Sequence, residues 1–369
     1  MKVFVAPLDW GLGHATRCAP IVQKFLDKGC DVELAVVKSN ASILREMFPD
    51  VRQRLAPSYN VVYPKHGYNM GLWLVKNSAH LKAVMRAEHH YAEEMVERHH
   101  YDIIVSDNRF AFYSKNAYSV YMTHQRRIAF PKAFKMFETV GEKWHAAMMK
   151  NFDEVWIPDL PDFPGYAGKL SHTSYCPRPL QFVGALSRFM LQKSISAESA
   201  SRDLKIVAVI SGVEPARTRF ESQLCTVLAH IPGKHVMILG KPHETANTWT
   251  EGNITFYNHL PSEAFARIVR RAEWVVSRGG YSTVMDMAVL SAKCIFVPTP
   301  GQYEQIALAE DLARGNAAVA IDESQLSAEM LNRILKENKV VELPRPSDND
   351  YLDIAVSRVL EKASTKKEG

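Results

Sequence analysis

The sequence lacks the features that mark membrane, secreted and nucleic-acid-binding proteins. Its five cysteines include no CxxC pair, so neither a zinc site nor a disulfide framework is indicated. No run of about 18 uncharged apolar residues is present, and the N-terminal residues are typical of a buried strand rather than a signal peptide. A net charge of +5 over 369 residues is too small for duplex binding, although it permits docking on an anionic surface. We therefore expect a cytoplasmic protein without a nucleic-acid partner.

The chain does contain enough apolar residues for two domains. Hydrophobic residues make up 47% of the sequence and charged residues 23%, and 369 residues exceed one ordinary core. We expect a first domain over residues 1–185, a polar, serine-rich linker over 186–203 and a second domain over 204–346. A C-terminal helix and tail would occupy 347–369, with Lys366, Lys367 and Glu368 frayed.

Both halves alternate strands with helices. In the first half, periodicity predicts helices at Arg17–Lys28 and Ala83–Arg98, and strands at Val3–Pro7, Val32–Val37, Asp102–Ser106, Ser119–Thr123 and Glu154–Ile157. In the second half it predicts a helix at Arg217–Ala229 and strands at Leu204–Ser211, His235–Leu239, Ile254–Tyr257, Trp274–Ser277 and Cys294–Pro298. This α/β alternation predicts doubly wound parallel sheets, which bind ligands beyond the carboxyl ends of their strands.

A glycine-rich loop, LDWGLGHATR, follows the first predicted strand. Gly11 and Gly13 allow the backbone to approach a ligand, and the following helix N-terminus offers N–H groups to an anion. His14, at the helix start, is expected to point into the cleft, where an imidazole can take a proton from a hydroxyl or a water. A plain tight turn with a solvated histidine is the alternative.

Asp107 follows another strand of the first half, in the stretch VSDNR. From a strand end in the same domain its carboxylate could reach His14, fix the imidazole tautomer and stabilise the imidazolium. An aspartate that starts a turn or caps a helix fits the local pattern equally well.

The second half carries the most specific pattern, SRGGYSTVMDMA followed by FVPTPGQYEQ. A strand runs into two glycines and then into a helix, which makes a phosphate-accepting helix start. Asp286 lies in the early turns of that helix, where it could bond vicinal ribose hydroxyls. The residues expected to line this pocket are Arg278, Gly279, Gly280, Ser282, Thr283, Asp286, Glu304 and Gln305.

These blocks and the first loop resemble the donor-binding signature and N-terminal loop of the peptidoglycan glycosyltransferase MurG and its GT-B relatives (glycosyltransferase family 28-like). The resemblance covers most of the chain. It implies two Rossmann-like domains facing a central cleft, with the C-terminal helix packing back on the first. It also implies an inverting glycosyltransferase, without metal or other cofactor, that moves an N-acetylhexosamine or hexose from a UDP-sugar such as UDP-GlcNAc. The acceptor would be a cell-envelope glycan or a lipid-linked hydroxyl, with peripheral contact at the inner face of the membrane.

Site roles follow from the same resemblance. Asp286 matches the ribose-binding acid, Glu304 and Gln305 match a Gln-Gln pair on the donor sugar, and His259 with Leu260 falls where the family holds uracil. Glu304 replaces a neutral amide, which leaves the sugar's identity open. His14 and Asp107 match the His–Asp dyad of other inverting GT-B enzymes. Further acceptor-side residues are Gly11, Gly13, Arg17, Arg109, His124 and Arg126.

The loop at residues 211–217 departs from the family pattern. Val213 stands in place of a serine and Pro215 in place of a glycine, which removes a hydroxyl and a backbone N–H from the expected diphosphate contact. Diphosphate binding is therefore expected to rely on Gly212, Arg217, Thr218 and the helix start after Gly279.

Other segments have two interpretations each. Residues 124–127 (HQRR) follow a strand and could meet an acceptor phosphate, or form an exposed basic turn. Tyr59–Leu74, with Lys65, His66, Lys76 and His80 nearby, could lie on a membrane interface or wrap an acceptor, or form a partly buried loop. The DxD-like triplet Asp348–Asp350 is explained by helix capping rather than by metal binding.

Three other functions stay open. A UDP-sugar hydrolase related to MurG shares the Gly-x-Gly-His-x-x-Arg loop and would release UDP without an acceptor. A UDP-sugar 2-epimerase would yield an isomerised sugar. A non-catalytic nucleotide-sugar sensor would bind UDP with no activity to lose when His14 is replaced.

Overall fold

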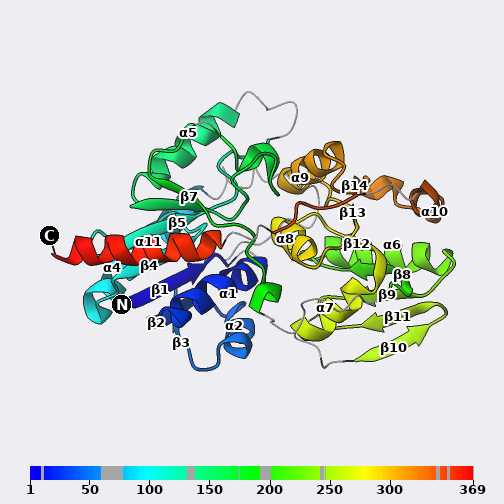
Figure 1. Cartoon of the computed structure of the whole chain (residues 1–369), viewed down its shortest axis with the longest axis horizontal. Coiled ribbons are helices and arrows are strands. Elements are labelled where there is room, and N and C mark those ends of the chain that lie inside the picture. The colour runs from blue at the N-terminus through cyan, green and yellow to red at the C-terminus, as the bar shows by residue number, and fades with distance from the viewer. Residues whose placement is uncertain are drawn as a thin grey trace. The chain divides into compact units, whose positions relative to one another are not determined.

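A computed structural model describes residues 1–9, 12–59, 78–130, 138–173, 175–191, 201–241, 245, 247–337, 341–346 and 350–368. The chain divides into two compact units. The first unit contains the described residues up to Leu191 together with those from Pro346 onward, and the second contains those between Gln192 and Arg345. Each unit is an α/β structure in its own right (Figure 1).

The first unit is built on a seven-stranded parallel sheet of order β3-β2-β1-β4-β5-β6-β7. Its strands are β1 (Lys2–Pro7), β2 (Asp31–Val36), β3 (Arg52–Leu55), β4 (Ile103–Asp107), β5 (Tyr118–Met122), β6 (Glu154–Ile157) and β7 (Leu180–Phe182). The helices are α1 (Leu12–Asp27), α2 (Ala41–Met47), α4 (Ser78–His99), α5 (Glu138–Met149) and α11 (Tyr351–Glu368), with short 3-10 turns η2 (Gly168–Leu170) and η3 (Arg188–Leu191).

Alternation along the strands gives this sheet two apolar faces. Phe4 and Ile104 pack with α4 residues such as Val96, and Val155 packs with Met149 of α5. The alternate positions face α1, where Phe25 stacks on Trp156. Both faces are covered by helices, as a parallel sheet requires.

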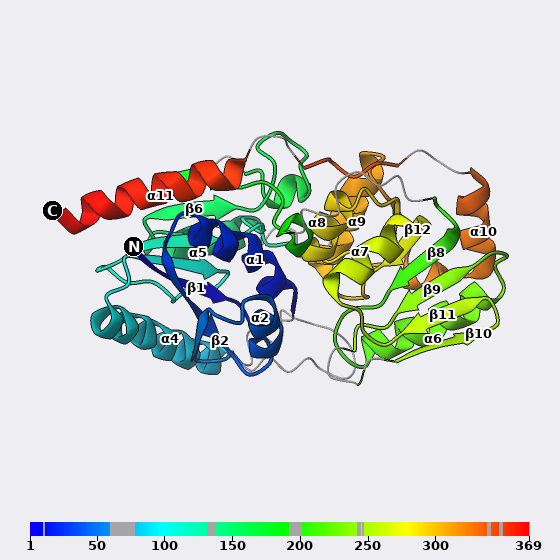
Figure 2. The same ribbon diagram turned by 60° about the horizontal axis from the view of Figure 1, so that its bottom comes forward.

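The last helix, α11, returns to the first unit, as expected. It packs against α1, β4, β5 and β7 and lies along the sheet in Figures 1 and 2. The expected fraying of its end is wrong, because α11 continues to Glu368. Lys366 Nζ lies 2.9 Å from Asp153 and Lys367 Nζ lies 2.9 Å from Asp102. These ion pairs hold the final turns against the sheet.

The second unit is built on a seven-stranded sheet of order β10-β11-β9-β8-β12-β13-β14, parallel except for the β10–β11 pair. Its strands are β8 (Leu204–Val209), β9 (His235–Ile238), β10 (Thr248–Glu251), β11 (Ile254–Tyr257), β12 (Ala272–Ser277), β13 (Cys294–Phe296) and β14 (Val319–Ala320). Its helices are α6 (Ala216–Ala229), α7 (Ser262–Arg270), α8 (Tyr281–Val289), α9 (Tyr303–Arg314) and α10 (Ala328–Glu337), with the 3-10 turn η5 (Glu323–Gln325). One core cluster joins this sheet to α6 and α10.

Some predicted segments differ from the structure. The helix expected from Arg17 begins at Leu12, so His14 lies inside its first turn. Part of the expected linker is packed within the first unit, where Phe189 of η3 is buried. Most of that linker, Gly11, nearly all of the aromatic segment 59–74 and residues 348–349 lie outside the described residues. Asp350 accepts the N–H of Asp353, as expected of a helix cap.

Candidate active site

Strand register decides which side chains meet at the end of β4. Asp107 is paired with Pro7 of β1 and follows the same alternation as Val105 and Val3. It therefore points toward the face that α1 covers, whereas Ser106 points toward α4. The side chain of Asp107 is completely buried.

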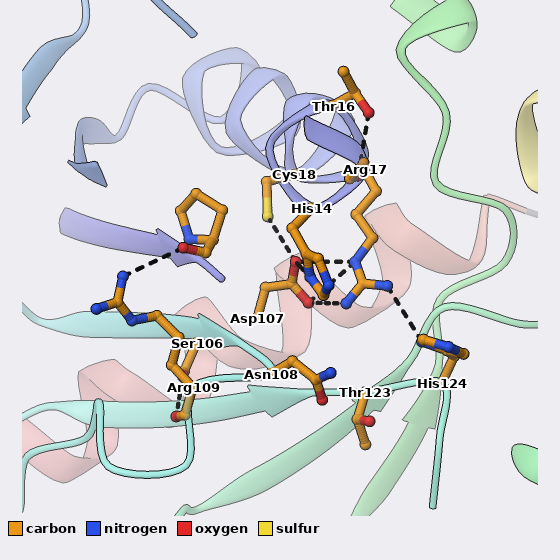
Figure 3. A network of polar contacts seen from close by, with 12 residues as sticks. His14, Thr16, Arg17, Cys18, Ser106, Asp107, Asn108, Arg109, Thr123 and His124 are labelled. Atoms are coloured by element: carbon orange, nitrogen blue, oxygen red, sulfur yellow. Dashed lines mark hydrogen bonds and ion pairs between the residues drawn. The ribbon is translucent and has the colours of Figure 1, made fainter. Parts of the chain in front are cut away.

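Helix α1 directs three side chains at this carboxylate. His14, Arg17 and Cys18 are three and four positions apart, so they share one face of the helix, and Figure 3 shows them converging on Asp107. Nδ1 of His14 lies 2.9 Å from Oδ2 of Asp107, which is the contact expected from the sequence. When Nδ1 donates its proton to the carboxylate, Nε2 of the neutral ring carries the lone pair that can accept a proton.

Arg17 holds the same carboxylate more extensively than His14 does. Its Nε donates to Oδ1 at 3.1 Å and to Oδ2 at 2.9 Å, and Nη2 also donates to Oδ1. Its Nη1 lies 3.2 Å from Nδ1 of His124. Arg17 is 2% exposed, and its guanidinium is enclosed by protein partners. Its expected place on the acceptor side stays a prediction.

Burial and charge shift the pKa values in this cluster. Burial opposes the negative charge of Asp107, but the charges of Arg17 and His14 and their hydrogen bonds hold its pKa well below the usual range. Burial lowers the pKa of His14, and Arg17 lowers it further, while Asp107 acts in the opposite direction. The structure thus favours an ionised Asp107 beside a neutral His14.

Cys18 is a member of this site that the sequence analysis did not select. Its Sγ lies 3.6 Å from Oδ2 of Asp107, and burial raises its pKa well above the ordinary value. The thiol therefore acts as a weak donor to the carboxylate rather than as a nucleophile. The i+4 spacing from His14 was the available signal.

Arg109 does not belong to this cluster. It lies beyond β4 on the α4 side, where Nε contacts Glu88 at 2.5 Å and Nη2 donates to the Pro57 carbonyl at 2.5 Å. Arg109 and Glu88 are both completely buried. The charge of Arg109 is paired with Glu88 inside the unit. Its expected place on the acceptor side stays a prediction.

The basic stretch after β5 is also turned inward. Arg126 is buried and donates to the carbonyls of Ser171 and Tyr175, and Arg127 pairs with Glu142. His124, which is 3% exposed, lies against Arg17. The exposed basic turn is therefore wrong for His124 and Arg126. The expected contact of this stretch with an acceptor phosphate stays a prediction.

In the second unit, helix α8 begins directly after the two glycines. Gly280 occupies the N-cap position and has no side chain to occupy the first-turn N–H groups. A Cβ at Gly280 would come no closer than 3.9 Å to Thr283 Oγ1, and one at Gly279 would lie 3.7 Å from the Gln305 carbonyl. The start of α8 and the start of α9 are therefore close together.

The less buried face of α8 carries its polar residues. Tyr281, Val284, Met285, Met287 and Ala288 are buried in the unit. Ser282, Thr283 and Asp286 are only partly buried, and their spacing places them on one side of the helix. His259 and Leu260, between β11 and α7, are also partly exposed.

Arg278 has a structural position that the sequence analysis did not foresee. It is 1% exposed, lies over the Phe220 ring at 3.9 Å and pairs with Glu323 at 2.6 Å. It also donates to the carbonyls of Val297 and Ala216. Arg278 thus connects the first turns of α6 to the end of β13. Its expected contact with the donor stays a prediction.

The loop before α6 needs a glycine, and the arginine in the first turn of α6 is paired with two carboxylates. Gly212 has φ of 110°, a conformation that strains any other residue. Arg217 contacts Glu214 and Glu221, each at 2.7 Å, and Thr218 Oγ1 accepts a further bond from Arg217. Two carboxylates on one guanidinium weaken the expected attraction of Arg217 for a diphosphate.

Side-chain amides of two glutamines order the loop before α9. Gln305 Oε1 accepts the N–H of Thr299 at 2.9 Å, and Gln305 Nε2 donates to Gln302. Glu304 is partly buried in the first turn of α9. Gln305 therefore orders the loop that leads into the first turn of α9, where Glu304 lies.

Within the described ranges, no group of three or more His, Cys, Asp or Glu side chains is arranged to hold a metal ion. None of the helices in those ranges is both long enough and apolar enough to cross a bilayer.

Comparison with known proteins identifies the second unit most specifically. Residues 223–345 match the glycosyltransferase family 28 C-terminal domain. Over 83 residues, the chain is 36% identical to UDP-N-acetylglucosamine--N-acetylmuramyl-(pentapeptide) pyrophosphoryl-undecaprenol N-acetylglucosamine transferase of Buchnera aphidicola subsp. Schizaphis graminum (strain Sg), which is 21% of this chain. The chain spans 23% and 27% of the lengths of two curated relatives that it matches.

Solved structures share the fold over the whole chain. The glycosyltransferase of kitacinnamycin has a TM-score of 0.61 at 14% identity, covering 99% of this chain and 95% of its own. MurG of Acinetobacter baumannii has a TM-score of 0.54 at 14% identity, covering 100% of this chain and 94% of its own. The chain therefore has the GT-B fold of these glycosyltransferases, and its second unit carries the match to glycosyltransferase family 28.

Proposed function

We propose that this protein transfers a sugar from a UDP-linked donor to a hydroxyl acceptor, with His14 as the general base. The observation that carries the proposal is the 2.9 Å contact between His14 Nδ1 and buried Asp107 at the start of α1. It leaves Nε2 as the proton-accepting nitrogen of a histidine whose pKa is lowered by burial. The match to a family 28 domain supports a donor site in the second unit.

In the proposed reaction, the acceptor oxygen forms a bond to the anomeric carbon as the bond from that carbon to the diphosphate breaks. The hydroxyl proton passes to Nε2 of His14, and Asp107 stabilises the resulting imidazolium. UDP leaves with both electrons of the broken bond, and attack from the opposite side inverts the anomeric centre. The first-turn N–H groups of α8 are suited to the departing diphosphate, so no metal is needed in this scheme.

The substrates are proposed at the level of chemical class. The name of the Buchnera relative specifies an N-acetylglucosamine transferase acting on a pyrophosphoryl-undecaprenol acceptor. By similarity we propose UDP-GlcNAc or another UDP-hexose as donor, and a lipid-linked or cell-envelope glycan as acceptor. The protein would then work at the inner face of the membrane as a peripheral protein. Asp286 would bond the ribose, His259 and Leu260 would contact uracil, and Glu304 would contact the sugar.

The test is UDP release from a panel of UDP-sugars, with and without membrane lipid extract. We expect release that depends on both one UDP-sugar and the extract. Release at a similar rate without any acceptor would identify a hydrolase, and an isomerised sugar would identify an epimerase. If no UDP-sugar turns over or raises the melting temperature, the proposed function is wrong.

A further inference from the structure

The carboxylate of Asp107 receives more donors than a His–Asp pair requires. Both of its oxygens accept hydrogen bonds from Arg17, and Oδ2 also accepts from His14 and from the thiol of Cys18. Arg17 is 2% exposed and Asp107 is completely buried, so water does not compete for these contacts. In such surroundings a charged, forked hydrogen-bonding pair is strong and geometrically specific.

Charge compensation follows from this geometry. A buried carboxylate facing an imidazole alone would favour the imidazolium, because no other positive charge would be near it. Here the guanidinium already supplies that positive charge from the adjacent turn of α1. A proton on His14 would place a second positive charge beside Arg17.

We propose that Arg17 is a positioning residue that acts through Asp107: it fixes the carboxylate against Nδ1 of His14 and compensates its charge, so that His14 remains an uncharged base. This inference rests on the proposed function only in naming His14 as the base. Three residues thus act in series. Arg17 orients the carboxylate of Asp107 and keeps it ionised, and Asp107 in turn orients the ring of His14.

The other groups that interact with Asp107 or Arg17 favour the same state. From β5, the buried phenol of Tyr121 adds no charge, because its pKa is raised by burial and by Asp107. After β5, His124 lies with Nδ1 3.2 Å from Nη1 of Arg17, where Nδ1 can accept a hydrogen bond from the guanidinium. From α1, Cys18 stays a thiol. Arg17 is therefore the cation that balances Asp107 when His14 is neutral.

The direction of the pH effect follows. With Arg17 present, His14 loses its proton below the ordinary value of 6.5, so the base form persists in mildly acidic solution. Without Arg17, Asp107 would hold a proton on His14 and the base form would be lost on going from alkaline toward neutral pH. The acidic limb of kcat would shift to higher pH in the same variant.

The deciding measurement is a carbon-13 NMR titration of His14 in the full-length, histidine-labelled protein, with its signal assigned by loss in His14→Gln. We expect a wild-type midpoint below 6.5, in the tautomer protonated at Nδ1. Arg17→Gln should raise the midpoint by about one pH unit or more, which is a tenfold change in proton affinity. Exposed Arg45→Gln, on α2 of the same unit, should leave the midpoint unchanged.

Arg17→Lys separates charge from orientation. It keeps the positive charge but not the fork, so we expect a midpoint nearer to wild type than in Arg17→Gln, with kcat at least about tenfold lower and KM unchanged. A wild-type midpoint at or above 6.5, or an unchanged midpoint in folded Arg17→Gln, would overturn the inference. If Arg17→Gln does not fold, the inference is still tested by the wild-type midpoint and by the kcat and KM values of Arg17→Lys. The titration needs no substrate, so it can succeed even if the proposed transfer fails.

Discussion

At the scale of single residues, strand register determines which side chains contact each other near the proposed chemistry. Asp107 faces α1, whereas Arg109, two positions later, is paired with Glu88 on the α4 side. In the second unit, Ser277 ends β12 and Arg278 turns onto Phe220 of α6. Arg17 and Arg109 were both expected on the acceptor side, but they belong to different hydrogen-bond networks. Arg17 pairs with Asp107, and Arg109 pairs with Glu88.

Replacing His14 tests the proposed base directly. His14→Gln keeps a polar side chain but cannot take the proton, so we expect kcat to fall by about 10²–10⁴-fold. UDP affinity should stay within about threefold, because the proposed donor site lies in the second unit. Steady-state kinetics and calorimetric titration with UDP check both values. Activity that survives in His14→Gln would exclude the residue as the base.

Replacing Arg278 tests its structural assignment. Arg278→Met leaves Glu323 and several carbonyls without their buried donor, so we expect a loss on the order of 3 kcal/mol in the free energy of unfolding. Exposed Arg219→Met on α6 is the matched control and should change it by less than about 0.5 kcal/mol. Equal effects of the two variants in urea unfolding would contradict the assignment.

Sequence reasoning located His14 and Asp107 because both follow strands, where parallel sheets gather their ligands. It could not determine that Arg17, Arg109, Arg126 and Arg278 are buried. The side chain of an arginine near the end of a strand can point to solvent or to either face of the sheet. Which direction it takes depends on the carboxylate or carbonyl that binds its guanidinium, and that partner lies far away in the sequence. Glu88, for example, is 21 residues from Arg109.

At the scale of elements, the strands that sequence patterns found are the buried ones, such as β1, β4 and β8. The missed strands are the edges: β3 has the sequence RQRL, β7 has LQF, β10 has TWTE, and β14 contains two residues. Edge strands need little apolar sequence, because only one neighbour pairs with them. An edge strand can therefore be recognised only from its pairing with the neighbouring strand, which the sequence alone does not show.

Helix α8 provides a test of the donor site. Asp286→Ala removes a partly buried carboxylate from the polar face of the helix without changing the buried face. We expect UDP affinity to fall about 10- to 100-fold, as for loss of one charged hydrogen bond, with an unchanged melting temperature. A UDP titration that matches wild type would remove Asp286 from the site.

Helix α11 is held by apolar packing more than by its lysines. Val359 is completely buried, so Val359→Ala should lower the free energy of unfolding by about 2 kcal/mol. Lys366→Ala and Lys367→Ala remove exposed ion pairs and should each cost less than about 1 kcal/mol, while speeding amide exchange in the last turns. A lysine variant less stable than Val359→Ala would reverse this ranking.

At the scale of the whole molecule, the second unit is inserted into the first. The chain leaves the first unit after Leu191 and returns to it at Pro346. Sequence analysis expected α11 on the first domain from the family resemblance, and the pattern of α11 alone would not have shown which sheet it covers. Its buried side chains are Leu352, Ala355, Val356, Val359 and Ala363.

Separate expression of the parts tests this organisation. Residues 201–345 contain the complete sheet of the second unit and should fold and bind UDP alone. Residues 1–191 lack α11 and should be soluble and cooperative in unfolding only when a peptide of residues 346–369 is added. Cooperative unfolding of 1–191 by itself, at the same temperature with and without the peptide, would show that α11 is dispensable.

The return of α11 also sets an order of events during synthesis. On the ribosome, the sheet of the first unit is made first but must wait for the second unit to be translated before α11 can cover it. At roughly 5–20 residues per second, translation of residues 192–345 takes about 8–30 seconds. Throughout that interval the part of the sheet that α11 later covers is exposed on the nascent chain, and a chaperone would be expected to bind there.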